Sequence, residues 1–176
     1  SSCLELDECG VCGGDGSSCY CLSLHTGANL KSFYGLPENV YVPDIMSGLG
    51  TEVTGVITEG GACNQIGPGT WVGSQCSLRP AKGYWIIING NGAAVPSDSL
   101  CLEDVTPNDP ALEYNLHVGA NLVSFVSEDT VGVSDALPDD VESSIAGVIT
   151  EGGACSQIQP GQWVGSQCAF NGGKGY

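Results

Sequence analysis

An internal repeat constrains this fold more than any other feature of the sequence. The segments LHTGANLKSF (24–33), GVITEGGAC (55–63) and KGY (82–84) recur as LHVGANLVSF (116–125), GVITEGGAC (147–155) and KGY (174–176), each at an offset of 92 residues. The intervening parts match less well, and VYVPD (40–44) aligns better with VGVSD (131–135), which indicates compensating one-residue shifts. Such self-similarity predicts two copies of one domain.

The repeat divides the chain into three predicted parts. Residues 1–21 form a cysteine-rich acidic linker module, residues 22–110 form copy 1, and residues 111–176 form copy 2. Copy 1 continues past Tyr84 into WIII, whereas copy 2 stops at Tyr176, before the counterpart of 85–98. The chain resembles a window cut from a longer array, and we expect copy 2 to lack its last strand, leaving an open sheet edge. Either downstream residues or a strand from a neighbouring molecule would fill that edge.

Each copy has the pattern of a mainly β domain. Residues 29–33 and 121–125 alternate apolar and polar, and 84–88 has the pattern of a buried strand. Residues 43–49 can form one or two helical turns, and their counterpart at 134–141 begins with Ser or Asp as a candidate cap. We therefore predict two homologous small β-sandwich-like or barrel-like domains, each with one short helix, plus the disulfide-rich N-terminal linker.

Charge excludes several classes of partner. Twenty acidic residues and four basic ones give a formal net charge of −16, which repels nucleic acid. No apolar run approaches the ~18 residues of a membrane span, so we expect no membrane insertion. Ten cysteines in so short a chain indicate disulfides made in an oxidising compartment, extracellular or at the cell surface. Zinc is disfavoured because Cys9 and Cys12 form a CxxC pair without a second one.

The recurring cysteines predict a staple within each copy. Cys63 and Cys76 are 13 residues apart, flank Pro-Gly, and recur as Cys155 and Cys168. A hairpin with that turn brings its ends together, so we predict disulfides Cys63–Cys76 and Cys155–Cys168. The competing interpretation is a thioester between each first cysteine and the glutamine two positions on, Gln65 or Gln157.

Six cysteines remain, and they allow fifteen pairings. Cys21 and Cys101 flank copy 1, and Cys21 has no equivalent in copy 2, so we predict a Cys21–Cys101 disulfide that closes the first domain. Cys3, Cys9, Cys12 and Cys19 then pair within the head, with Cys3 paired across a junction as the alternative.

The head, DECGVCGGDGSSCYC (7–21), resembles the cysteine-rich segment of secreted thrombospondin-motif metalloproteases and similar spacers of large surface proteins. The resemblance implies a disulfide-tied extracellular linker. Protease activity does not follow from it, because the chain has no HExxH motif. Asp7, Glu8 and Asp15 are a candidate calcium site, and acidic clusters near Asp104 and Asp139 are weaker ones.

The repeat pattern LHxGANLxSF…GVITEGG…WVGSQ…GKGYW resembles a domain found in series along large secreted bacterial proteins. Members of that family often lack the two cysteines of each copy. The resemblance implies a surface, adhesin-like or filament-forming repeat, with self-association or contact between neighbouring repeats.

Other recurring side chains suggest chemistry less strongly. His25 and His117 could activate a cysteine, with Asn29 or Asn121 as the orienting group, but LHxGxN more often bonds a nearby turn at a strand entry. Glu59 and Glu151 supply one carboxylate per copy, short of the pair that glycosidases use.

Trp71 and Trp163 could stack on a glycan, although packing against the core is the commoner role of tryptophan. We therefore expect a non-enzymatic extracellular structural repeat protein: a segment of an adhesin, stalk or filament. The alternative is a calcium- or carbohydrate-binding surface module, with calcium as the one candidate cofactor.

Overall fold

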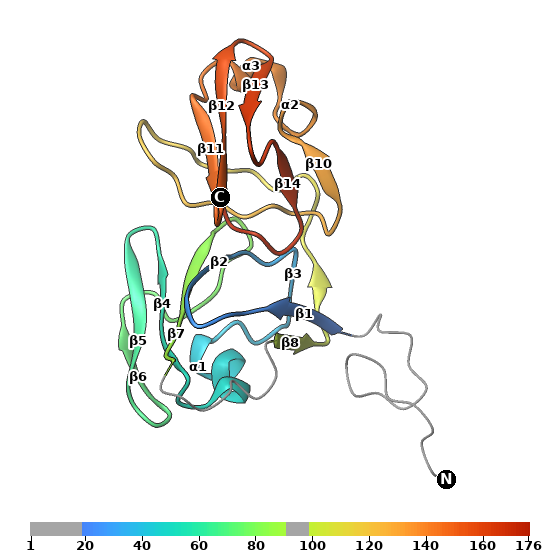
Figure 1. Ribbon diagram of the computed structural model, residues 1–176. Helices are drawn as coiled ribbons and strands as arrows, with labels where there is room; N and C mark the ends of the chain where they lie inside the picture. The colour runs from blue at the N-terminus through green and yellow to red at the C-terminus, as the bar shows by residue number, and fades with distance from the viewer. Residues whose placement is uncertain (1–18, 91–98) are drawn as a thin grey trace, which may run out of the picture.

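The computed structural model describes residues 19–90 and 99–176. Figure 1 shows two lobes, with copy 1 in the lower one, copy 2 in the upper one, and the C-terminus where they meet. Most of the regular structure is β, so the predicted mainly β fold class is confirmed. The candidate calcium residues Asp7, Glu8 and Asp15, together with Cys3, Cys9 and Cys12, lie outside the described residues.

Copy 1 is built on a five-stranded antiparallel sheet in the order β2-β7-β4-β5-β6. Its strands are β2 (Gly27–Lys31), β4 (Val53–Thr58), β5 (Gly61–Gly67), β6 (Thr70–Gly73) and β7 (Tyr84–Ile88). The central β7 alternates buried and partly exposed side chains, with Tyr84, Ile86 and Ile88 facing the core. The run predicted at 84–88 is thus the strand that organises this sheet.

A second layer covers the sheet of copy 1. It contains the antiparallel pairs β1 (Cys19–Ser23) with β8 (Ser99–Glu103) and β3 (Gly35–Leu36) with β9 (Thr106–Pro107), together with α1 (Val42–Ile45) and the 3₁₀ helix η1 (Met46–Leu49). Met46 and Leu49 are buried in the same cluster as Tyr20, Leu102 and Ile86. The core therefore lies between two layers, as in a sandwich.

Copy 2 repeats only part of this plan. A three-stranded sheet is formed by β11 (Gly147–Thr150), β12 (Gly153–Gln159) and β13 (Gln162–Gly165), and β10 (Thr130–Gly132) pairs with β14 (Ala169–Asn171). The helical part is two short helices, α2 (Val133–Ala136) and α3 (Asp139–Glu142), where one was predicted. Leu137 takes an extended conformation before Pro138, which breaks the helix. Gly132 precedes α2 without a side-chain cap, so the predicted Ser or Asp cap is wrong.

The structure also accounts for the one-residue shift between the copies. The amide of Val42 donates to the carbonyl of Cys76, and the amide of Val133 donates to the carbonyl of Cys168. The two bonds are equivalent, yet the valines are 91 residues apart and the cysteines 92. The shift therefore lies in the 34–54 region, where the sequences match poorly.

The predicted strand at 121–125 does not form. In copy 1, β2 pairs along its length with β7. In copy 2, the corresponding residues have a single β-bridge, at Val123, and no strand among the described residues pairs with them as β7 pairs with β2. A strand without a neighbour lacks partners for its amides and carbonyls, which explains the loss of regular structure.

Candidate functional site: the junction between the two copies

The histidine of each copy contacts the glutamate of the other. In the first contact, Nε2 of His25 is hydrogen-bonded to Oε1 of Glu151, and the amide of Leu30 donates to Oε2 of the same carboxylate, 3.0 Å away. Both oxygens of Glu151 are thus engaged by copy 1. A histidine at the entry to β2 and a glutamate after β11 meet across the junction.

The second contact is the same with the copies exchanged. Nε2 of His117 is hydrogen-bonded to Oε1 of Glu59, and the amide of Leu122 donates to Oε2 of Glu59 at 3.1 Å. Lys82 Nζ lies 3.9 Å from that second oxygen. The same arrangement of a histidine, a leucine and a glutamate therefore occurs twice. In each case the histidine and the leucine come from one copy and the glutamate from the other.

Backbone pairing continues each contact. The amide of Ser32 donates to Gly173 and that of Gly175 donates to Leu30. At the equivalent positions, the amide of Ser124 donates to Ala81 and that of Gly83 donates to Leu122. The residue after each recurring leucine forms a bridge with the recurring lysine of the other copy, Lys31 with Lys174 and Val123 with Lys82. A short stretch of each copy is thus paired, antiparallel, with the recurring Lys-Gly segment of the other.

Gly83 and Gly175 make this approach possible. A Cβ on Gly83 would lie 2.8 Å from the carbonyl oxygen of Val123, and a Cβ on Gly175 would lie 2.8 Å from that of Lys31. Real Cβ atoms do not come so close to backbone oxygen. The recurrence of Lys-Gly-Tyr is therefore explained by close backbone contact between the copies.

The LHxGAN segment holds each histidine in place. Gly27 has φ +103°, a conformation that favours glycine. The side chain of Asn29 is fully buried, accepts from the amide of His25 at 2.8 Å, and donates to the carbonyls of His25 and Gly27. The predicted role of this asparagine, bonding a turn at a strand entry, is confirmed.

The histidine rings are set up to carry a proton on both nitrogens. Nδ1 of His25 faces the carbonyl of Thr26 at 2.8 Å, and Nε2 faces a carboxylate, so both partners are acceptors. The hydrogen bond that His25 donates to Glu151, followed by the one that it donates to the carbonyl of Thr26, raises the pKa of His25. For His117 the Val118 carbonyl and then Glu59 raise the pKa.

The pKa values of the two glutamates shift in the opposite direction, downward. The hydrogen bonds of His117 and Leu122 hold the pKa of Glu59 below its ordinary value. Burial raises the pKa of Glu151, but the hydrogen bonds of His25 and Leu30 outweigh it, so the pKa is lowered. Each pair is therefore stabilised as imidazolium and carboxylate.

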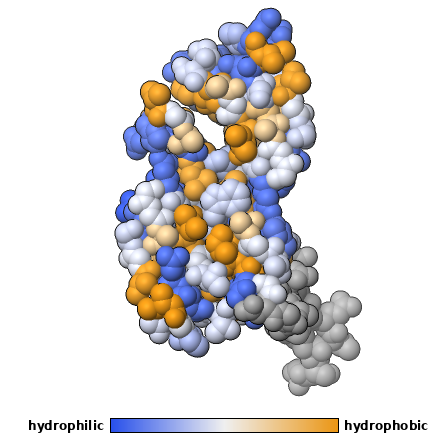
Figure 2. Space-filling model, turned by 60° about the vertical axis from the view of Figure 1, so that its left-hand side comes forward, coloured by the Kyte–Doolittle hydropathy of each residue, from blue (hydrophilic) through white to orange (hydrophobic). Residues whose placement is uncertain are grey.

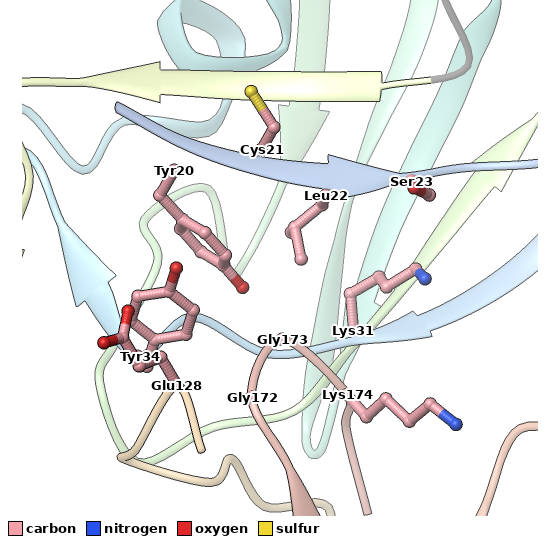
Figure 3. Close-up of a pocket in the computed structure, with 10 residues that line it drawn as sticks. All are labelled: Tyr20, Cys21, Leu22, Ser23, Lys31, Tyr34, Glu128, Gly172, Gly173 and Lys174. Atoms are coloured by element: carbon pink, nitrogen blue, oxygen red, sulfur yellow. The ribbon is translucent and has the colours of Figure 1, made fainter. Parts of the chain in front are cut away.

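Two of the four basic residues of this acidic chain lie side by side at the junction. Figure 3 shows Lys31 on β2 and Lys174 beside Gly173, with both side chains pointing to the same side of a pocket of about 350 Å³. Burial lowers the pKa of Lys31, Glu151 raises it in part, and Lys174 lowers it further. Copy 2 has Val123 in place of Lys31, so this lysine pair is not repeated.

The cysteines form staples and leave no reactive thiol in the described parts of the chain. Cys63–Cys76, Cys155–Cys168 and Cys21–Cys101 are disulfides, which are the pairings that the spacing predicts. Cys19 is disulfide-bonded as well. The thioester and the cysteine–histidine interpretations are therefore wrong. Disulfides of this density persist in oxidising compartments.

The tryptophans pack against the cores. Trp71 contacts the copy 1 cluster, and Trp163 contacts the copy 2 cluster and donates from Nε1 to Glu142 at 2.7 Å. Neither side chain is fully exposed. Among residues 19–90 and 99–176, no three His, Cys, Asp or Glu side chains gather to hold a metal ion, the acidic clusters near Asp104 and Asp139 included. Nor does any helix of this part have the length and apolar character to cross a bilayer.

Sequence reasoning missed the pairing of His25 with Glu151 and of His117 with Glu59. The signal was present, because both residue types recur at the offset of 92, but each was considered within its own copy. The fold and the junction define a disulfide-stabilised, mainly β protein in which two copies of one domain hold each other reciprocally. The chain matches no protein-family model, no curated protein and no solved structure at a significant level.

Proposed function

We propose that this protein is an extracellular structural repeat protein, a segment of an adhesin, a stalk or a filament-forming subunit, and that it is not an enzyme. The observation that carries the proposal is the use of the recurring histidines and glutamates. Both pairs join the two copies and both carboxylates are fully engaged there. The contact between the two copies thus accounts for the recurrence of these histidines and glutamates.

The junction between the two copies resembles a two-fold symmetric interface. Each copy offers the same surface and receives the same surface, and such contacts close after two members. The copies therefore act as one paired unit in the proposed role. Growth of an array or a filament then requires a second kind of contact, made between such units.

The remaining features suit a protein that must persist outside the cell. Cys21–Cys101 ties β1 to β8 directly across the strand pair, and the smaller staples tie each hairpin. Closing loops of these lengths stabilises the folded state by about 3–4.5 kcal/mol each in the chain-entropy model. The net charge of −16 keeps such units apart unless a specific contact joins them.

The proposal is tested by determining where the native protein is located and whether it forms polymers or stalks. Antibody against the chain should label intact cells of the source without permeabilisation, and negative-stain images of surface extracts should show labelled polymers or stalks. Label that appears only after permeabilisation would contradict the proposal.

Two binding experiments test the alternative, a calcium- or carbohydrate-binding surface module. A glycan array, with Trp71→Ala and Trp163→Ala as matched controls, should show no bound glycan. Thermal melting with and without chelator should show no change in melting temperature. A glycan signal lost in either variant, or a melting temperature that falls with chelator, would support the alternative.

A further inference from the structure

The outer face of the copy 1 sheet, turned away from the core, is apolar. The register of β7, β4 and β5 places Trp85, Ile57 and Ala62 side by side on this face. A second row runs from Ile87 on β7 to Val72 on β6. Ile57 is 40% exposed and Val72 47% exposed, and the other three are partly exposed. Figure 2 shows hydrophobic residues at the surface of the lower lobe, on the side that Figure 1 draws at the left.

This outer face is also free of charged side chains. In a chain with twenty acidic residues, the five strands of the sheet contain one charged residue, Lys31. Lys31 is the register partner of Tyr84, whose side chain faces the core, so Lys31 is not on the outer face. The carboxylates that give the net charge of −16 therefore lie elsewhere. Two copies of the chain can meet at this face without bringing carboxylates together.

The exposed apolar residues recur in copy 2. The outward isoleucine, alanine and valine of copy 1 have their counterparts, at the offset of 92, in Ile149, Ala154 and Val164. Ile149 is 71% exposed and Val164 is 59% exposed, and β11, β12 and β13 contain no charged residue. Burial in a core does not account for exposed apolar residues that recur. Their grouping on a sheet face indicates a contact surface.

One end of the face already contacts another copy of the domain. Leu30 on β2 is the register partner of Trp85, so it extends the same row. Its side chain is 4% exposed because Gly175 of copy 2 lies against it. The remainder of the row, from Trp85 to Ala62, continues from that contact toward solvent. The outer face is therefore continuous with the junction between the copies.

We propose that the outer sheet face is a self-association surface, which binds the same face of a second molecule of this chain, sheet against sheet. Two identical faces are self-complementary when a two-fold axis relates them, and their side chains interdigitate in a layer about 10 Å thick. Each copy has one such face, so pairing at both joins molecules into a linear polymer. The inference rests on the proposed function in one respect, since it supplies the second kind of contact that a filament requires. The contact itself is measured on the purified chain, so its failure would leave the location of the native protein unaffected.

The size of the face sets the expected strength. Five strands about 4.8 Å apart make a face about 20 Å wide, and its two rows cover on the order of 300 Å². A standard stable interface buries about 800 Å² on each partner. One pair of faces should therefore bind weakly, and a polymer should form only at high concentration.

Sedimentation equilibrium of the purified chain, from about 10 μM to about 1 mM, measures the association. The average mass should rise with concentration past that of a dimer, which also shows that the contact is between molecules. Association should strengthen as salt is raised from about 0.05 M to about 0.5 M, because salt screens the repulsion between acidic surfaces. A contact made by ion pairs would weaken instead.

Aspartate substitutions locate the contact. The double variant Val72→Asp and Val164→Asp should remain a monomer at every concentration, and either substitution alone should stop growth at a dimer. Val118→Asp is the matched control, because it makes the same change at a fully exposed valine outside the face. It should associate as the unmodified chain does. All these side chains are exposed, so melting temperatures should change little.

Four results would overturn the proposal. They are an unmodified chain that stays monomeric at about 1 mM, a double variant that associates as strongly as the unmodified chain, a single variant that grows past a dimer, and a Val118→Asp control that disrupts association equally.

Discussion

The imidazole of His25 is hydrogen-bonded to the carboxylate of Glu151, although 126 residues separate them in sequence. Glu59 binds His117 in the same manner, so every member of the two pairs reaches into the other copy. The repeat is therefore more than a duplication of one fold. It places matching halves of a junction on both copies.

The first prediction concerns the dependence of stability on pH. The pKa values of His25 and His117 are raised above 6.5, so their contribution is full below pH 6.5 and is lost as pH rises through the raised values. The pKa values of Glu59 and Glu151 are lowered below 4.5. Their contribution to stability is therefore full above pH 4.5 and is lost as pH falls through the lowered values. We expect the melting temperature to be highest between these limits.

Thermal melting from about pH 3 to pH 9 measures this profile. In the double variant His25→Gln and His117→Gln, the decline on the alkaline side should largely disappear. Because the histidines are largely exposed, about 1 M salt should also flatten the profile. An unchanged alkaline decline in the double variant would show that other groups cause it.

The second prediction concerns the close backbone contact at Gly83 and Gly175. Alanine at either position places a methyl group against a backbone carbonyl of the other copy, and we expect a loss of about 1–3 kcal/mol in the free energy of unfolding. Denaturant titration measures the loss. Gly48→Ala is the matched control, because nothing lies within 4 Å of its Cβ position and no unusual φ is required there. A neutral Gly83→Ala would argue against close contact.

Much of this fold could be predicted from the sequence. The offset of the repeat, the strand at 84–88 and the Pro-Gly hairpins with their cysteine staples depend on local pattern, and the structure contains them. The strand at 121–125 was predicted wrongly because its pattern is right but its partner is absent from the described residues. Strand formation depends on a neighbour, which local alternation does not reveal.

The junction was harder to predict for a different reason. His25 and Glu151 are joined by the way two domains pack, and no local spacing encodes such packing. Recurrence could have indicated that these residues matter, yet it does not say whether they meet within a copy or between copies. Lys82 and Gly83 are likewise paired with residues of the other copy, Val123 and Leu122.

The third prediction concerns the staples. Replacing Cys63 and Cys76 together with serine should lower the free energy of unfolding by about 3 kcal/mol, because the unfolded chain gains the freedom of a 13-residue loop. The same change at Cys155 and Cys168 should cost a similar amount in copy 2. Denaturant titration under non-reducing conditions measures both. Intact mass should increase on reduction, whereas a loss of about 17 Da that resists reductant would indicate a thioester and contradict the structure.

The measurement that tests the reciprocal junction most directly is hydrogen exchange at the amides of Leu30 and Leu122. Leu30 donates to Glu151 and Leu122 donates to Glu59, each across the junction. Glu151→Ala should therefore speed exchange at Leu30 first, and Glu59→Ala should speed it at Leu122 first, with Glu38→Ala, an exposed acid, as control. If each variant instead affects the leucine of its own copy, or neither leucine, the copies do not hold each other in this way.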